Sequence, residues 1–173
     1  MKKSVKIILL IVVVAILGGA LYFLNADSKE NKNMVVLQLP EETVTQISFK
    51  TTYANREAVL LKDEAGVWKC EDVLVKDVFI NDIFNSISPL RAKAEIEKPE
   101  DLSPYGLDNP KVVVQIKTTS GDFEILIGGY NAVDKAYYYM VSGNDNVFVT
   151  EEGSKLNYAF DYDTDAFIQG QKK

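Results

Sequence analysis

Residues 111–128 read KVVVQIKTTSGDFEILIG, and this stretch decides the fold class. Apolar residues occupy every second position of 111–119, which is the pattern of a half-buried β-strand. Ser120-Gly121 marks a tight turn, and the same alternation resumes over 122–128. A connection this short joins antiparallel strands only. The stretch therefore predicts an antiparallel β-hairpin, and the rest of the chain is interpreted outward from it.

Short strands and turns surround this hairpin. We expect an extended segment at 34–39 and strands at 44–52, 57–62, 67–70, 135–141 and 146–150. Three further expectations concern the segments between them. Gly128-Gly129 ends the second strand of the hairpin, residues 92–102 are charged and irregular, and residues 151–156 form a short helix.

One soluble helix is expected, beginning at Asp77 as its cap and ending near Pro89. Between them, apolar residues recur at helical spacing from Phe79 to Leu90, which is typical of a helix packed on a sheet. Because the strand connections are short, the sequence predicts an α+β fold rather than α/β. We expect an antiparallel sheet of about seven strands in two sets, with this helix packed between them.

An uncharged apolar run precedes the domain. Residues 7–24 read IILLIVVVAILGGALYFL, and about 20 such residues cross a hydrocarbon core of roughly 30 Å. We expect a transmembrane helix here, with the lysine-bearing residues 1–6 in the cytoplasm. A cleaved signal peptide is the alternative. Its apolar region is about 7–15 residues and ends in small residues, whereas Leu24 is bulky.

The expected organisation follows from that anchor. Residues 25–33 form a polar tether, 34–160 an extracytoplasmic domain and 161–173 an acidic tail. The protein is then a single-pass protein of the cell membrane, with its N-terminus in the cytoplasm.

Charge and composition restrict the function classes. Nineteen basic residues face 25 acidic ones, a net charge of −6, which argues against nucleic acid and against an electrostatic grip on lipid. Histidine, the commonest general base and metal ligand, is absent. The single cysteine, Cys70, alternates with Trp68 on one strand, which predicts a buried, inert thiol. A reactive nucleophile is the alternative and would need a nearby base.

No cofactor or metal is expected. Asp161, Asp163 and Asp165 resemble the opening of a calcium-binding loop, but Ala166 stands where that loop requires glycine. Phosphate-binding, nucleophile-elbow and dinucleotide motifs are also missing. The sequence therefore predicts that the protein is not an enzyme. A hydrolase using a carboxylate pair stays a remote alternative, because 25 acidic residues always offer some pair.

Two segments are candidate sites. Tyr137, Tyr138 and Tyr139, with Tyr130, would form an aromatic surface for a partner. Consecutive strand residues must split between faces, and plain sheet packing is the alternative. The second segment is the turn YGLDNP, which a chain reversal explains as well as a ligand site does. We expect a structural turn formed by Tyr105, Gly106, Leu107, Asp108, Asn109 and Pro110.

The order of these motifs resembles a known family. YGLDNP at 105–110 precedes ILIG at 125–128, the Tyr-Tyr pair at 137–138 and VFVT at 147–150. The chain resembles, over about residues 44–160, the bacterial family catalogued as domain of unknown function 4340. No catalytic residue is established for that family. The resemblance implies a membrane-anchored protein, in some cases encoded near ABC-type transporter subunits of the gliding-motility kind.

The leading hypothesis is a non-catalytic accessory protein that is anchored in the membrane and binds another membrane or cell-envelope protein, such as an ABC-type transporter component. The alternative is a binding module for an envelope polymer or a small ligand, using the tyrosine strand.

Overall fold

A computed structural model describes residues 34–52, 55–152, 154–156 and 158–160. The chain divides into two units, Met1–Lys32 and Asn33–Lys173. The expected anchor at 7–24, the tether at 25–33 and the tail at 161–173 lie outside the described residues. Within the described ranges, no helix is both long enough and apolar enough to cross a membrane.

The described residues contain eleven strands and one α-helix. The strands are β1 Met34–Leu37, β2 Val44–Thr51, β3 Arg56–Lys62, β4 Trp68–Cys70, β5 Val73–Leu74, β6 Leu90–Ala92, β7 Ala94–Ile96, β8 Val112–Thr118, β9 Gly121–Asn131, β10 Ala136–Val141 and β11 Val147–Val149. The helix is α2 Asp77–Ile87, and the 3-10 turns are η1 Glu41–Thr43, η2 Ser103–Tyr105 and η3 Tyr158–Phe160.

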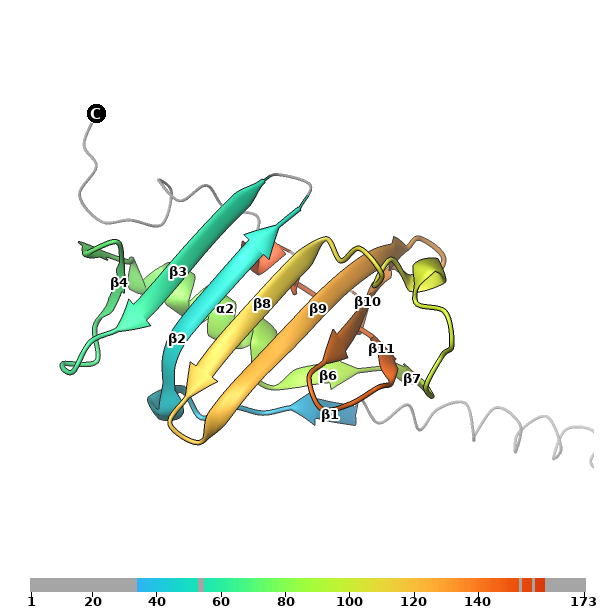
Figure 1. Ribbon diagram of the computed structural model, residues 1–173, viewed down its shortest axis with the longest axis horizontal. Coiled ribbons are helices and arrows are strands. Elements are labelled where there is room, and N and C mark those ends of the chain that lie inside the picture. Colours follow the sequence, from blue (N-terminus) through green and yellow to red (C-terminus); the bar gives the residue numbers. More distant parts are fainter. Residues whose placement is uncertain (1–33, 53–54, 153, 157, 161–173) are drawn as a thin grey trace, which may run out of the picture. The chain divides into compact units, whose positions relative to one another are not determined.

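Nine strands form one antiparallel sheet in the order β5-β4-β3-β2-β8-β9-β10-β11-β7 (Figure 1). β1 and β6 form a separate antiparallel pair. The predicted antiparallel α+β class is confirmed, and so is the hairpin of β8 and β9. The expected seven strands in two sets are wrong, because β2 pairs with β8 along seven residue positions and joins both sets into one sheet.

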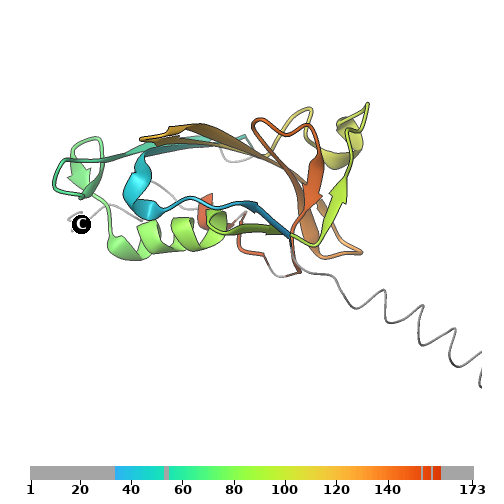
Figure 2. The same cartoon turned by 90° about the horizontal axis from the view of Figure 1, so that it is seen from below.

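One side of the sheet is covered by α2 and by the β1–β6 pair (Figure 2). The helix buries the stripe formed by Ile80, Ile83, Phe84 and Ile87. These side chains meet the inner face of the sheet, where Trp68 contacts Phe84 with ring centroids 6.0 Å apart. Asp77 is not the helix cap as expected. Lys76 occupies that position without a capping side chain, and Asp77 lies in the first turn, where its charge favours the helix dipole.

The chain closes the core at its described C-terminal end. Leu156, Ala159 and Phe160 are buried, and the ring of Phe160 lies 5.3 Å from that of Phe49 on β2. The helix predicted at 151–156 is wrong, since no described residue of that stretch is helical.

Two other local predictions are wrong for physical reasons. β9 does not end at Gly128-Gly129 but continues to Asn131, paired with β10. Glycines stand at these two positions because a neighbouring turn fills the space that side chains would take. The segment 92–102, expected to be irregular, contains the last residue of β6 and all of β7. Three residues per strand are too few for alternation to be recognised in a sequence.

Candidate functional site

The four candidate tyrosines do not form one surface. Tyr139 is fully buried, whereas Tyr130 is 48% exposed. Tyr137 is half-buried and lies with its ring 4.9 Å from that of Tyr130. Tyr138 contacts Tyr105 edge-on at 5.0 Å, and its hydroxyl accepts a hydrogen bond of 2.9 Å from the Asn131 amide. The predicted split between faces is confirmed, and a partner-binding role for the group stays a prediction.

The YGLDNP turn packs on the sheet. Gly106 has a φ of 64°, and its Cβ, if present, would lie 2.9 Å from the backbone nitrogen of Gly129. A Cβ at Gly128 would lie 2.3 Å from the carbonyl oxygen of Tyr105 and 2.9 Å from Cγ of Leu107. The backbones therefore approach as closely as glycine allows. Leu107 is buried, so the turn contributes a packed side chain, and its structural role stays a prediction.

The ends of this turn are held by hydrogen bonds. Asp101 accepts one of 2.9 Å from the Ser103 amide, and contacts with Ser103 hold the pKa of the Asp101 carboxyl below its usual value. Thr52 donates to the carbonyl of Pro110 at 3.1 Å. Asp108 and Asn109 are exposed. The turn thus covers part of the outer face of β9.

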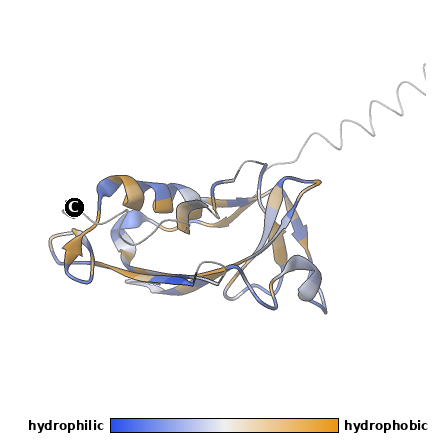
Figure 3. Ribbon diagram, turned by 90° about the horizontal axis from the view of Figure 1, so that it is seen from above, coloured by the Kyte–Doolittle hydropathy of each residue, from blue (hydrophilic) through white to orange (hydrophobic). Residues whose placement is uncertain are grey.

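A different part of the outer face is uncovered and apolar. We define the β3–β5 patch as Val59, Leu61, Val67 and Leu74, which are 40%, 52%, 40% and 43% exposed. Leu61 faces Lys69 across β3 and β4, and Lys69 faces Leu74 across β4 and β5, so the three side chains share one face. Hydrophobic colouring marks this end of the sheet (Figure 3).

Lys69 lies at the centre of the patch. Its ammonium bridges Asp63 at 2.8 Å, and this contact raises the pKa of Lys69 and lowers that of Asp63. The opposite face of the same strands is packed. Trp68 and Cys70 are buried there, as predicted for the thiol, and burial raises the pKa of Cys70. An unreactive thiol is what this surrounding provides.

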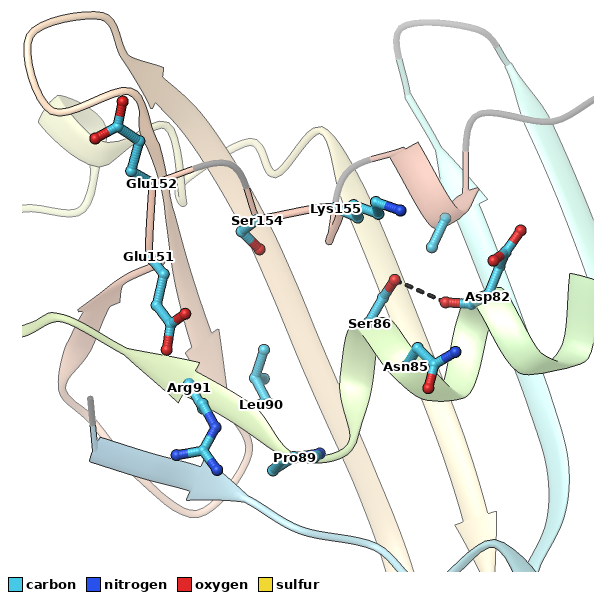
Figure 4. Close-up of a pocket in the computed structure, with 11 residues that line it drawn as sticks. Asp82, Asn85, Ser86, Pro89, Leu90, Arg91, Glu151, Glu152, Ser154 and Lys155 are labelled. Atoms are coloured by element: carbon cyan, nitrogen blue, oxygen red, sulfur yellow. Dashed lines mark hydrogen bonds between the residues drawn. The ribbon is translucent and has the colours of Figure 1, made fainter. Parts of the chain in front are cut away.

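A cleft of about 740 Å³ lies between α2, β6 and the segment at 151–159 (Figure 4). Its described lining is Asp82, Asn85, Ser86, Pro89, Leu90, Arg91, Glu151, Glu152, Ser154, Lys155 and Ala159. Glu151 and Arg91 lie at one end and Asp82 and Lys155 at the other (Figure 4). None of these described lining residues is aromatic, so the candidate tyrosines do not contribute to the cleft.

Two buried oxygens, one of them in the lining of this cleft, have no hydrogen-bond partner among the described residues. They are Oε1 of Glu151 and the hydroxyl of Tyr139. Burial, and secondarily the charge of Glu151, raise the pKa of Tyr139. Buried polar atoms are normally paired with protein or water, so a bound water or a polar ligand group would satisfy them.

Metal binding has no candidate among the residues described. No group of three or more Cys, Asp or Glu residues lies close enough there to hold an ion. The aspartates at 161, 163 and 165 lie outside the described residues.

Sequence reasoning missed both the β3–β5 patch and the cleft. The patch residues belong to short strands whose exposed face is apolar, so alternation alone does not say which face is buried. The lining of the cleft comes from three segments that come together only in the folded chain, so no local sequence pattern reveals it. The useful signal was Leu61 beside Leu60, since two adjacent leucines on a strand place one on each face.

Comparison with known proteins identifies a family. A family model described as "Domain of unknown function (DUF4340)" matches residues 79–168. The match begins inside α2 and extends beyond η3. It covers the YGLDNP turn and the strands from β6 to β11, but not β1 to β5. Neither the curated proteins nor the solved structures contain a match.

Proposed function

The chain belongs to the DUF4340 family, whose function is undefined, and from that premise we propose that it is a membrane-anchored accessory protein that binds another protein of the cell envelope. The single observation that carries the binding part is the β3–β5 patch. Four exposed aliphatic side chains surround one lysine there, on a sheet face that no other described element covers. Exposed apolar groups of this kind are typical of interaction surfaces.

The geometry of the sheet edge supports a protein as partner. β5 is two residues long and pairs only with β4 among the described strands. An added strand from a partner would find main-chain groups at this edge and apolar contacts on the adjoining face. The resemblance of the chain to transporter-associated members makes an ABC-type transporter component the leading candidate.

Membrane anchoring supports the same proposal. The uncharged run at 7–24 would hold the domain beside the bilayer, and a tether of nine residues has an r.m.s. reach of roughly 15–18 Å. A domain so confined meets other membrane proteins at a raised effective concentration, so a weak interface suffices. The full chain should resist carbonate extraction, and protease added outside should digest the domain. Release of a soluble form beginning near Ala26 would contradict the anchor.

The binding test compares variants on two parts of the outer face. Leu61→Ser combined with Leu74→Ser should remove co-purifying proteins from solubilised membranes, as measured by mass spectrometry. Both side chains are exposed, so the free energy of unfolding should change by less than about 1 kcal/mol. Lys117→Ser, on the outer face of β8, is the matched control and should keep the partner. Retention of the same partners by the double variant would contradict the proposal.

A second candidate function is binding of a small polar ligand in the cleft. The unpaired Oε1 of Glu151 favours it, together with a volume within the range of ligand sites, about 300–1,000 Å³. Native mass spectrometry of the purified full chain would detect a retained ligand, which Glu151→Gln should release.

A further inference from the structure

The turn between β9 and β10 holds a fully exposed aliphatic residue in a braced loop. Val133 is 92% exposed. Oδ1 of Asn131 accepts hydrogen bonds from the amides of Val133, at 3.0 Å, and Asp134, at 3.2 Å. Its amide nitrogen donates to the Asp134 carboxylate at 2.7 Å and to the Tyr138 hydroxyl at 2.9 Å. Four hydrogen bonds from one side chain thus fix a turn whose tip is apolar.

This turn is tied to the start of the domain. The Lys93 ammonium donates to the carbonyl of Asp134 at 3.0 Å and lies 3.3 Å from its carboxylate. Lys93 follows Ala92, which is paired with Met34, the first described residue. Met34 and its neighbour Val35 are 37% and 44% exposed. The tip of the turn and the first strand therefore belong to the same end of the domain.

The other exposed groups at this end have matching chemistry. Tyr130 is half-exposed and close enough to Lys135 to affect its pKa. Lys135 bridges Glu152 at 3.1 Å. An aliphatic tip, a tyrosine and lysines are the residue types that populate the boundary between lipid and water.

We infer that this end of the domain rests on the lipid surface, with Val133 inserted among the headgroups. The inference rests on the anchor proposed above, and the length of the preceding chain supports it. Only nine residues, 25–33, separate the apolar run from Met34, and fully extended they span at most about 30 Å. The end that carries Met34 is therefore the end to which the expected anchor is tethered.

The net charge of −6 does not oppose this contact locally. The charged groups facing this end are Arg91, Lys93 and Lys135, against Asp134 and Glu152. Both acids are already paired with lysines, at 3.3 and 3.1 Å. Neither of these two acids is left without a lysine partner for anionic headgroups to meet.

The test places an environment-sensitive fluorophore at two turns of the full chain in vesicles of phosphatidylcholine and phosphatidylglycerol. Cys70→Ala removes the native thiol, and Val133→Cys or Ser120→Cys receives an NBD label. Ser120 is exposed in the turn at the opposite end of β9, about 35 Å away along an eleven-residue strand. We expect a blue shift and quenching by spin-labelled lipid at 133, and neither at 120.

The outcomes distinguish the membrane anchor from the lipid contact of Val133. Flotation of the unlabelled chain with the vesicles after carbonate treatment tests the anchor separately. If the chain floats and the label at 133 behaves like the label at 120, the lipid contact is wrong and the anchor stands. If the chain does not float, the anchor and the lipid contact both fall. Melting curves of the labelled variants check that the domain is folded.

Discussion

The outer face of the sheet is covered by the chain over β9 and β10 and is left uncovered by the described residues over β3 to β5. Over β9 and β10, the chain covers the sheet with its own turn, which places Tyr105 on Tyr138 and its backbone on Gly128-Gly129. Over β3 to β5, no described element covers the face, and Leu61 and Leu74 stay exposed. Both regions have an apolar, packed inner face. They differ only in what lies on the outside.

Because of this difference, we expect substitutions in the two regions to affect different properties, namely folding stability and binding. The covered side has its contacts fulfilled within the chain, so substitutions there should act on folding. The exposed apolar side chains of the β3–β5 patch add little to the free energy of unfolding, because solvent already surrounds them. Under the proposed function, another molecule covers these side chains.

The largest effect is expected on the covered side. Gly128→Val should lower the free energy of unfolding by about 3 kcal/mol, because a Cβ there would lie 2.3 Å from a backbone oxygen that cannot move freely. Thermal melting would measure the loss. Gly129→Ala is the graded control. Its nearest contact is 3.2 Å, so its loss should be clearly smaller. Equal melting temperatures for both variants and wild type would mean that the turn does not pack on β9.

A smaller effect is expected from pH. Burial raises the pKa of Tyr139, so above pH ~10 the unfolded chain releases this proton while the folded chain keeps it. Stability should then fall by about 1.4 kcal/mol per pH unit, and Tyr139→Phe should remove that part of the slope. Burial raises the pKa of Cys70 as well, with the same sign, so the slope of the variant is subtracted from that of wild type.

Neutral pH gives the matching control. Tyr139→Phe should not destabilise the protein there, because no described protein group forms a hydrogen bond with the buried hydroxyl. Tyr138→Phe should cost about 0.5–1.5 kcal/mol, because its hydroxyl accepts from Asn131. The reverse order, measured by urea unfolding, would contradict the placement of the two rings.

The smallest effect is expected at the uncovered side and has the opposite sign. Glu71 and Asp72 join β4 to β5 with φ values of 48° and 70°, the backbone of a two-residue hairpin turn that prefers Asn-Gly. Glu71→Asn with Asp72→Gly should raise the free energy of unfolding by about 1 kcal/mol, because Asn and Gly adopt the left-handed backbone conformation with less strain than Glu and Asp. Gly66→Ala should lower stability instead, because Gly66 has a φ of 82°, although a Cβ there would meet nothing closer than Cε of Lys62 at 4.0 Å.

Sequence patterns predicted the parts of the fold that alternate over many residues. The hairpin at 111–128 and the stripe of α2 each repeat long enough for a period to be recognised, and both are present. The glycines at 128 and 129 were misinterpreted as a break. Their reason is a contact with residues 105–107, more than 20 positions away, which no local pattern contains.

The candidate site was less predictable than the fold. Three consecutive tyrosines had to split between faces, but which one faces inward depends on the register of β10 against β9. That register shifts between Tyr137 and Tyr139. Leu61 is exposed because no described element covers it, and the alternation of residues in the sequence carries no information about covering elements. The family match locates the domain but assigns no role to any residue.

The pairing of β2 with β8 also sets an order of events during synthesis. β2 ends at Thr51 and its partner is complete only at Thr118, so the middle of the sheet closes across a long intervening segment. At about 5–20 residues per second, the ribosome needs roughly 3–13 s to supply the missing strand. During that interval, the hairpin of β2 and β3 is on its own only marginally stable and carries an open hydrogen-bonding edge. A chaperone that protects this nascent edge would shorten the time for which it can aggregate.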